Sequence, residues 1–270
     1  MLRLDIDKNH HYEIIFSGGL GNQIFSAAVF FLLHHLSIKV SANLSYFDAA
    51  PLVAQPGMPG QVSSWAWELD KLGISKDSLL GNSCQGHHVT VQIPDGEWKM
   101  LAAIHALQQA QVLKEFRAVS LERVTKELSQ RGLTLPSDFI AIHLRRGDYL
   151  NVASHIVPDH VLLPYAIRAS RFSKNLVIVS DSPIPAEPWQ SLRSHFDQLF
   201  QIDDPGMDVA QIHSLMASAK VLFTSNSQFS LSAAFFNPNV VFIPDRWYGQ
   251  LHATLERLIV EQSPFFLFNS

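Results

Sequence analysis

Two adjacent arginines, Arg145 and Arg146, are the strongest sign of chemistry in this sequence. They follow Phe139–Ile142, a short apolar run that is typical of a buried strand. A guanidinium is always charged and is costly to bury without a partner. Because phosphate suits its planar fork, the pair predicts an anion site; the alternative is pairing with nearby carboxylates such as Asp148. The segment reads His143-Leu144-Arg145-Arg146-Gly147-Asp148-Tyr149.

The composition is that of a globular protein with a sizeable core. The 270 residues are 47% hydrophobic and 16% charged, enough for one large domain or two medium ones. The net charge of -4 shows no excess of positive charge, so nucleic acid is not expected as a partner. The single cysteine, Cys84, excludes an internal disulfide framework and a multi-cysteine zinc site, and it fits a reducing compartment.

No segment of the sequence predicts a membrane span. The most apolar early stretch, from Ala27 to Leu33, is much shorter than the roughly 20 residues that a spanning helix needs. The N-terminus lacks the apolar core of a signal peptide. We therefore expect a cytoplasmic location, with the inner face of the cell membrane as an alternative. The tail Pro264–Phe268 is too short to anchor and is expected to pack as a C-terminal clasp, with a peripheral membrane contact left open.

Strand-like runs alternate with helical patterns, which is typical of an α/β protein with parallel sheets. We expect two Rossmann-like domains at residues 1–135 and 136–270, facing a central cleft, with a helix near the C-terminus and a loop-rich segment at 43–64. The expected strands are Tyr12–Phe16, Phe139–Ile142, Leu176–Val179, Val221–Thr224 and Asn239–Ile243. The expected helices cover 22–36, 97–116 and 121–131, the last ending at Gly132, which can take a left-handed cap.

Polar loops follow four of these strands. In sheets of this kind, the loops that leave the carboxyl ends of the strands line the ligand crevice. We interpret these four loops as the candidate site: Gly18–Gln23, His143–Tyr149, Ser180–Pro183 and Ser225–Ser230.

The first loop reads Gly18-Gly19-Leu20-Gly21-Asn22-Gln23 and joins a strand to a helix. Glycines allow a close backbone approach, and the free amides of a helix start can bind phosphate. The loop lacks the lysine of a P-loop and the spacing of the dinucleotide fingerprint. A tight turn without a ligand is an equal alternative.

Asp181 and the last loop allow two roles each. A carboxylate at Asp181 can accept the two N–H donors on the edge of guanine, although its local sequence favours capping of the next segment. The last loop, Ser225-Asn226-Ser227-Gln228-Phe229-Ser230, can hold phosphate oxygens and cap a helix at the same time.

A metal site is not expected. None of the 13 histidines stands in a pattern typical of metal ligands. Asp203-Asp204 resembles an acidic metal motif of some sugar transferases, but its setting before Pro205-Gly206 favours a turn. We therefore expect neither a catalytic metal nor a cofactor.

Three segments follow one another along the chain: Gly-Gly-Leu-Gly-Asn-Gln-x-Phe, His-x-Arg-Arg-Gly-Asp-Tyr and Ser-Asn-Ser-x-Phe-Ser. In this order they resemble the α-1,2-fucosyltransferases of glycosyltransferase family 11. The similarity runs from about Ile15 to Trp247 and is vague over 45–135. It implies a GT-B fold, GDP-fucose as the donor, and inverting, metal-independent transfer of fucose to the 2-hydroxyl of a galactose-containing glycan acceptor. The acceptor side would be residues 1–135 and the nucleotide-sugar side 136–270.

The resemblance also implies roles for individual residues. His143 and Arg145 would bind the donor, with Arg145 on the β-phosphate, and Arg146 and Asp148 would brace them. By similarity to the wider superfamily of GDP-fucose enzymes, Asp181 resembles the carboxylate that reads guanine. Further donor contacts would come from Ser225, Asn226, Ser227 and Gln228 of the last loop and from Gly21, Asn22 and Gln23 of the first.

One departure from the family lies after the last motif. Family members often carry Phe-Ser-Trp-Trp there, whereas this chain has Phe229-Ser230-Leu231-Ser232, so the loop is lined differently. Without a Golgi-type anchor, the chain resembles a bacterial member. Such enzymes are expected to act in surface polysaccharide synthesis, for example of the lipopolysaccharide O-antigen.

The general base is not fixed by any motif. Asp148 is nearest to the arginines, but pairing with them would depress its basicity. His155 is the other candidate, and a plain surface histidine is its alternative. Two other functions stay open: another GDP-sugar transferase of α-1,6 or peptide-O type, and a non-catalytic nucleotide-sugar-binding protein.

Overall fold

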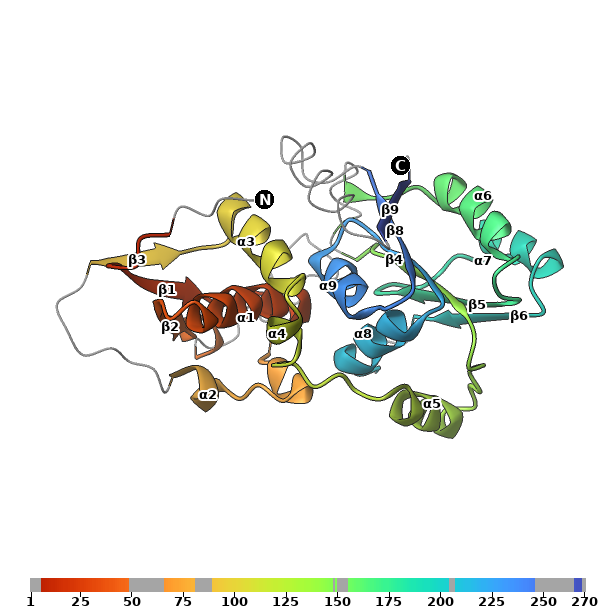
Figure 1. The fold of residues 1–270 in the computed structure, drawn as a ribbon. Coiled ribbons are helices and arrows are strands. Elements are labelled where there is room, and N and C mark those ends of the chain that lie inside the picture. Colours follow the sequence, from red (N-terminus) through yellow and green to blue (C-terminus); the bar gives the residue numbers. More distant parts are fainter. Residues whose placement is uncertain are drawn as a thin grey trace, which may run out of the picture. The chain divides into compact units, whose positions relative to one another are not determined.

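The computed structural model describes residues 6–48, 66–80, 89–147, 149, 155–203, 207–245 and 265–268. The chain forms two compact units, the described residues up to Ala118 in the first and those from Val119 on in the second. Each unit is built on its own parallel sheet (Figure 1). The α/β class expected from the alternating pattern is confirmed.

The first unit has a sheet of three strands in the order β2-β1-β3. Its strands are β1 (His11–Ile15), β2 (Lys39–Asn43) and β3 (Thr90–Ile93). Its helices are α1 (Leu20–His35), α2 (Lys76–Leu80), α3 (Glu97–Leu107) and α4 (Ala110–Leu113), with 3₁₀ turns at Ser45–Phe47 and Leu69–Leu72. Helix α1 is apolar and buried over most of its surface, so it lies in the core and packs against α3.

The single helix expected over 97–116 is wrong, because the chain breaks it into α3 and α4. The break lies at Gln109, whose extended backbone (φ -92°, ψ 118°) cannot continue a helix. After it, Val112 and Phe116 are both buried, and the Phe116 ring lies edge-on to Phe31 at 5.9 Å. The apolar spacing runs across the break, so the sequence pattern alone did not mark it.

The second unit has a sheet of six parallel strands in the order β6-β5-β4-β7-β8-β9. The strands are β4 (Ile140–Leu144), β5 (Asn175–Ser180), β6 (Gln198–Ile202), β7 (Val221–Phe223), β8 (Val240–Pro244) and β9 (Phe265–Phe268). Every residue of the central β4 is buried, as its unbroken apolar run predicts for a strand covered on both faces.

The helices of the second unit are α5 (Leu121–Gln130), α6 (Asp159–Ala169), α7 (Ala186–Trp189), α8 (Val209–Ser218) and α9 (Gln228–Phe236), with a 3₁₀ helix at Gln190–Ser194. Helix α5 ends before Gly132, whose φ of +80° gives the expected left-handed conformation. It packs against α8 and so belongs to the second unit, which starts earlier than the boundary expected near residue 135.

The C-terminal tail packs as an edge strand of the second unit. Strand β9 pairs with β8, and the buried Phe268 ring lies 5.2 Å from that of Tyr165 on α6. The expected C-terminal helix falls in 246–264, outside the described residues, as does most of the loop-rich 43–64 segment. In the ranges that the structure describes, no helix has both the length and the apolar character to cross a membrane.

Candidate functional site

The strand order of the second unit brings three of the four predicted loops together. Strand β4 lies between β5 and β7 and is parallel to both. The loops that follow them therefore leave the same edge of the sheet: Arg145–Gly147 after β4, Asp181 after β5 and Ser225–Ser227 after β7. In parallel α/β sheets this carboxyl edge is where ligands bind.

Asp181 holds the loop Arg145–Gly147, which we call the arginine loop. Its Oδ2 lies 2.7 Å from Nη1 of Arg145, and its Oδ1 accepts the backbone N–H groups of Arg146 (2.7 Å) and Gly147 (3.0 Å). A carboxylate offers about four acceptor positions, and these contacts use three of them. Reading guanine, which presents two donors, would require Asp181 to release one of its present contacts.

Gly147 is required by this arrangement. A Cβ built on Gly147 would lie 2.6 Å from Oδ2 of Asp181, closer than a real carbon atom approaches. The glycine of the Arg-Arg-Gly segment thus leaves room for the carboxylate that orients Arg145.

Arg146 is held by the start of helix α6. Its guanidinium forms an ion pair with Asp159 and donates to the carbonyl oxygen of Val157 at 3.1 Å. The two neighbouring arginines therefore differ, because Arg145 meets a carboxylate at the strand edge while Arg146 ties the loop to α6. The alternative expected from the sequence, pairing with carboxylates, is realised by Asp181 and Asp159.

His143 is buried within β4 and supports the loop after β7. Its Nδ1 lies 2.8 Å from Oγ of Ser225. Burial lowers the pKa of His143 to about 3, and the charges of Arg145 and Arg146 act in the same direction. The ring is therefore neutral near pH 7, so it fixes Ser225 by a hydrogen bond and adds no charge of its own.

The turn between β7 and α9 is closed by its serines. The Ser227 side chain caps α9 by accepting from the N–H of Phe229, and the Ser230 hydroxyl lies 3.1 Å from the backbone nitrogen of Ser225. Asn226 is only 2% exposed, and its Oδ1 has no hydrogen-bond partner among the described residues. A buried polar atom without a partner is unusual, and this oxygen still has its acceptor positions available. Gln228 is the first residue of α9 and is half-buried.

His213 of α8 was not predicted from the sequence. The ring of Phe229 lies 5.7 Å from that of His143 and 5.8 Å from that of His213. His213 is buried, its pKa is lowered to about 3 by burial, and its Nε2 lies 3.0 Å from Oγ of Ser232 on α9. Two neutral histidines thus hold the first turn of α9. The only signal for His213 in the sequence is its place within the largely apolar run that forms α8.

His155 reaches the arginine loop through an aromatic contact. The Tyr149 ring lies 5.3 Å from that of His155, and the guanidinium carbon of Arg145 lies over the Tyr149 ring at 5.1 Å. The second candidate base, Asp148, lies outside the described residues.

The first loop lies in the first unit, at the carboxyl end of β1. Gly18 has a φ of +68°, and a Cβ there would lie 2.4 Å from Nδ2 of Asn22, so this position needs glycine. The Gln23 amide donates to the carbonyl oxygens of Gly18 (2.9 Å) and Ala66 (2.8 Å) and accepts from the N–H of Glu68 (2.9 Å). Gln23 therefore braces the loop, with Gly21 buried beside it at the start of α1.

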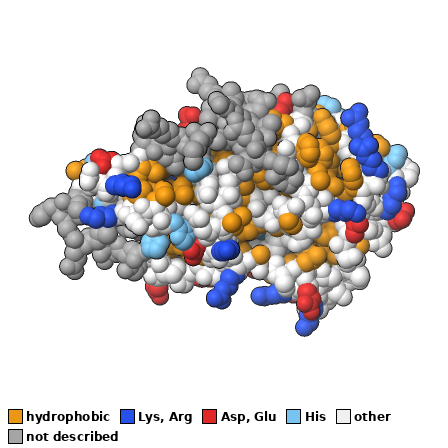
Figure 2. All heavy atoms as spheres, in the orientation of Figure 1, with side chains coloured by type: hydrophobic (Ala, Val, Ile, Leu, Met, Phe, Trp, Pro, Cys, Tyr) orange, Lys and Arg blue, Asp and Glu red, His pale blue; other side chains and the backbone are white. Residues whose placement is uncertain are grey.

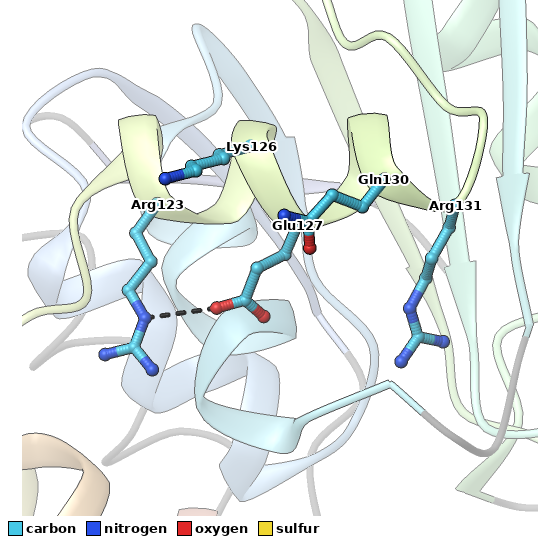
Figure 3. A pocket seen from close by; sticks show the side chains of 5 residues that line it. All are labelled: Arg123, Lys126, Glu127, Gln130 and Arg131. Atoms are coloured by element: carbon cyan, nitrogen blue, oxygen red, sulfur yellow. Dashed lines mark hydrogen bonds and ion pairs between the residues drawn. The ribbon is translucent and has the colours of Figure 1, made fainter.

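A surface cavity of about 520 Å³ lies along α5, and none of the residues that line it is a predicted site residue. Figure 3 shows the side chains that line it, with Arg123 paired to Glu127 at 3.1 Å. Its lining residues are Arg123, Lys126, Glu127, Gln130 and Arg131. On the face drawn in Figure 2, basic and acidic side chains are scattered with no large area of one sign, in keeping with the small net charge.

No cluster of three or more His, Cys, Asp or Glu side chains suited to a metal ion occurs in the described part of the chain. Asp203 accepts the backbone N–H of Ile184 at 2.8 Å through Oδ2, and Asp204 lies outside the described residues.

The fold is similar to that of solved fucosyltransferases. POFUT1 in its apo form superposes with a TM-score of 0.51 at 14% identity, covering 88% of this chain and 98% of that one. POFUT1 in complex with GDP-fucose gives 0.50 at 13% identity, over 88% and 96% of the two chains. The chain has a GT-B-like α/β fold. NodZ α-1,6-fucosyltransferase, solved with GDP, gives a TM-score of 0.46 at 12% identity, over 85% and 93%. No protein-family model matches the chain, and no curated protein matches it in sequence.

Proposed function

We propose that this protein is a glycosyltransferase that transfers fucose from GDP-fucose to the 2-hydroxyl of a galactose-containing glycan. One observation carries the proposal: Arg145, Asp181 and the Ser225–Gln228 turn lie at neighbouring strand ends of one parallel sheet. The GT-B-like fold supports it, and POFUT1, which shares that fold at low identity, has been solved with GDP-fucose.

Arg145 is proposed to bind the β-phosphate of the donor. In the reaction, the bond between fucose C1 and the β-phosphate oxygen breaks, and its electron pair stays on GDP. The charge that develops there needs donors that are already in place. The Arg145 guanidinium, oriented by Asp181, and the amides that start α9 supply such donors. These groups would take the part that a metal ion plays in other enzymes, so we propose metal-independent transfer.

The acceptor oxygen would attack C1 from the face opposite to GDP, which inverts the configuration. Its proton must go to a base. His155 and Asp148 are the candidates from the motif region. His155 and Arg145 both contact the ring of Tyr149.

The α-1,2 linkage is supported by the combination of the first loop with the Ser225–Ser230 segment. A role in surface polysaccharide synthesis is proposed from the resemblance to bacterial members of that family. The test is a panel of galactose-terminated acceptors with GDP-fucose, followed by linkage analysis of the product. An α-1,2 product without added metal supports the proposal. An α-1,6 or peptide-O product would replace the acceptor assignment. Donor binding without turnover on any acceptor would favour a non-catalytic binding protein.

A further inference from the structure

The arginine loop and the start of α6 are joined through one side chain, that of Arg146. Its guanidinium uses Nη2 for the ion pair with Asp159, the first residue of α6, and Nη1 for the carbonyl oxygen of Val157 at 3.1 Å. The planar fork is therefore held at two points. Asp159 belongs to none of the four loops that the sequence marks as the candidate site.

A continuous chain of contacts leads from Asp159 to Arg145. Asp159 holds the side chain of Arg146, and the backbone N–H of Arg146 donates to Oδ1 of Asp181 at 2.7 Å. Oδ2 of the same carboxylate lies 2.7 Å from Nη1 of Arg145. One carboxylate thus fixes the side chain of Arg146 and another fixes its backbone. All four residues belong to the second unit, so the chain of contacts lies within one compact body.

The pair of Arg146 with Asp159 is shielded from solvent. The two side chains are 13% and 23% exposed. Exposed ion pairs contribute little, whereas removing one partner of a shielded pair leaves the other charge without compensation. Without the Asp159 carboxylate, the Arg146 guanidinium would turn towards water and would draw the loop backbone away from Asp181.

Stabilisation of α6 accounts for only part of this arrangement. A carboxylate in the first turn of a helix interacts favourably with the helix dipole, which explains an acidic residue at position 159. It does not explain the direction of Arg146, which also reaches the Val157 carbonyl before the helix begins.

We propose that Asp159 is a positioning residue for the diphosphate of the donor. It fixes Arg146 and the backbone of the arginine loop and thereby, through Asp181, the direction of the Arg145 guanidinium. The inference rests on the proposed function and adds a residue to its donor site. The effect of Asp159 passes through Arg145, and no bond to Asp159 forms or breaks in the reaction.

The first test measures the dissociation constant of GDP and the steady-state kinetics of Asp159→Asn. We expect the dissociation constant of GDP and the donor KM to rise by about 3–30-fold, while the acceptor KM stays within about twofold. Electrostatics alone predicts the opposite sign, because removing a negative charge favours an anionic ligand. Asp138→Asn is the matched control, since it removes a carboxylate of the same unit that is paired with Lys220 at 2.7 Å, and it should change neither constant. Unchanged or tighter GDP binding by folded Asp159→Asn would overturn the inference.

The second test separates positioning from a general loss of stability. In an Arg145→Ala background no guanidinium is left to position, so adding Asp159→Asn should change the dissociation constant of GDP by less than about twofold. Asp159→Glu, which keeps the carboxylate, should recover most of the affinity that Asp159→Asn loses. An equal loss with and without Arg145 would show that Asp159 acts on the stability of the unit and would refute the positioning role.

A further variant covers the case in which Asp159→Asn does not fold. Arg146→Lys keeps the positive charge but lacks the planar fork that spans Asp159 and Val157, so it should also weaken GDP binding. Parent-like affinity in Arg146→Lys would then contradict the inference. A parent protein that does not bind GDP refutes the proposed function, and with it this inference, before any variant is made.

Discussion

The Asp181 carboxylate and the Arg145 guanidinium form an ion pair at 2.7 Å across two neighbouring strand ends. The same carboxylate accepts two backbone N–H groups of the arginine loop, so it sets both the loop conformation and the direction of the guanidinium. The pair is partly buried, which makes its geometry better defined than that of a surface ion pair. Orientation of the cation before substrate arrives is what stabilisation of a departing phosphate requires.

If Arg145 stabilises the leaving group as proposed, Arg145→Ala should lower kcat/KM for transfer by about 10²–10³-fold or more while the fold is retained. Steady-state kinetics together with circular dichroism check this. Lys126→Ala, at a residue that lines the surface cavity along α5, is the control and should be neutral. A folded Arg145→Ala variant with near-normal turnover would contradict the role of Arg145.

Asp181→Asn separates two roles of the carboxylate. If Asp181 orients Arg145, the variant should weaken binding of GDP and inosine diphosphate by the same factor. If Asp181 reads guanine, the parent should bind GDP more tightly than inosine diphosphate, and the variant should lose that preference. Titrations with both nucleotides measure the ratio of their dissociation constants in the parent and in the variant. Since three acceptor positions of Asp181 are already used, we expect equal weakening. Asp138→Asn, which removes a surface pair with Lys220, should change neither affinity.

Gly147→Ala should reduce turnover because the added methyl group would lie 2.6 Å from Oδ2 of Asp181 and would push the carboxylate away from Arg145. We expect a loss in kcat/KM that approaches that of Asp181→Asn, with a smaller change in melting temperature. Kinetics and melting on the same preparation measure both. Full activity in this variant would show that the contact between Asp181 and Arg145 does not matter for turnover.

The buried histidines should make the fold sensitive to acid. The pKa of His213 is lowered from 6.5 to about 3, so the unfolded chain binds its proton between these pH values while the folded chain does not. Stability is therefore complete above pH 6.5 and falls as the pH drops towards 3, by up to about 1.4 kcal/mol per pH unit for one such histidine. His143 has the same sign and range.

His213→Asn should make the pH dependence of unfolding shallower between pH 6.5 and 4, because the variant has no proton to take up on unfolding. Urea titrations at several pH values measure this slope. Replacing an exposed histidine, as in His160→Asn at the start of α6, should leave the slope unchanged. A slope in His213→Asn equal to that of the parent would refute a neutral, buried His213.

The sequence predicted the strands and the loops that follow them where the signals are local. The apolar run before His143 and the glycine and serine loops after three strands are visible in short windows, and β4, β5 and β7 form close to where those windows placed them. The loop at Gly18 could be predicted for the same reason, since its positive φ requires glycine.

The partners of the charged residues could not be predicted, because they depend on contacts between distant segments. Asp181 meets Arg145 only because β5 is placed next to β4, and Asp159 meets Arg146 because α6 starts beside the loop. No sequence pattern marks Lys99 as buried, and its contacts with Ile15 and Asp95 form only when α3 packs in the first unit. Strand β6 was missed since its residues are mostly half-exposed and polar in part.

The most direct test of the central claim, a metal-independent site for a GDP-sugar, is thermal melting with excess GDP, UDP or ADP, each with and without EDTA. A ligand at one hundred times its dissociation constant stabilises by about 2.7 kcal/mol, a shift of several degrees. We predict a shift with GDP that EDTA does not change, little or none with UDP and ADP, and a much smaller GDP shift in Arg145→Ala. No shift with GDP, an equal shift with every nucleotide, or a shift that EDTA abolishes would contradict the claim.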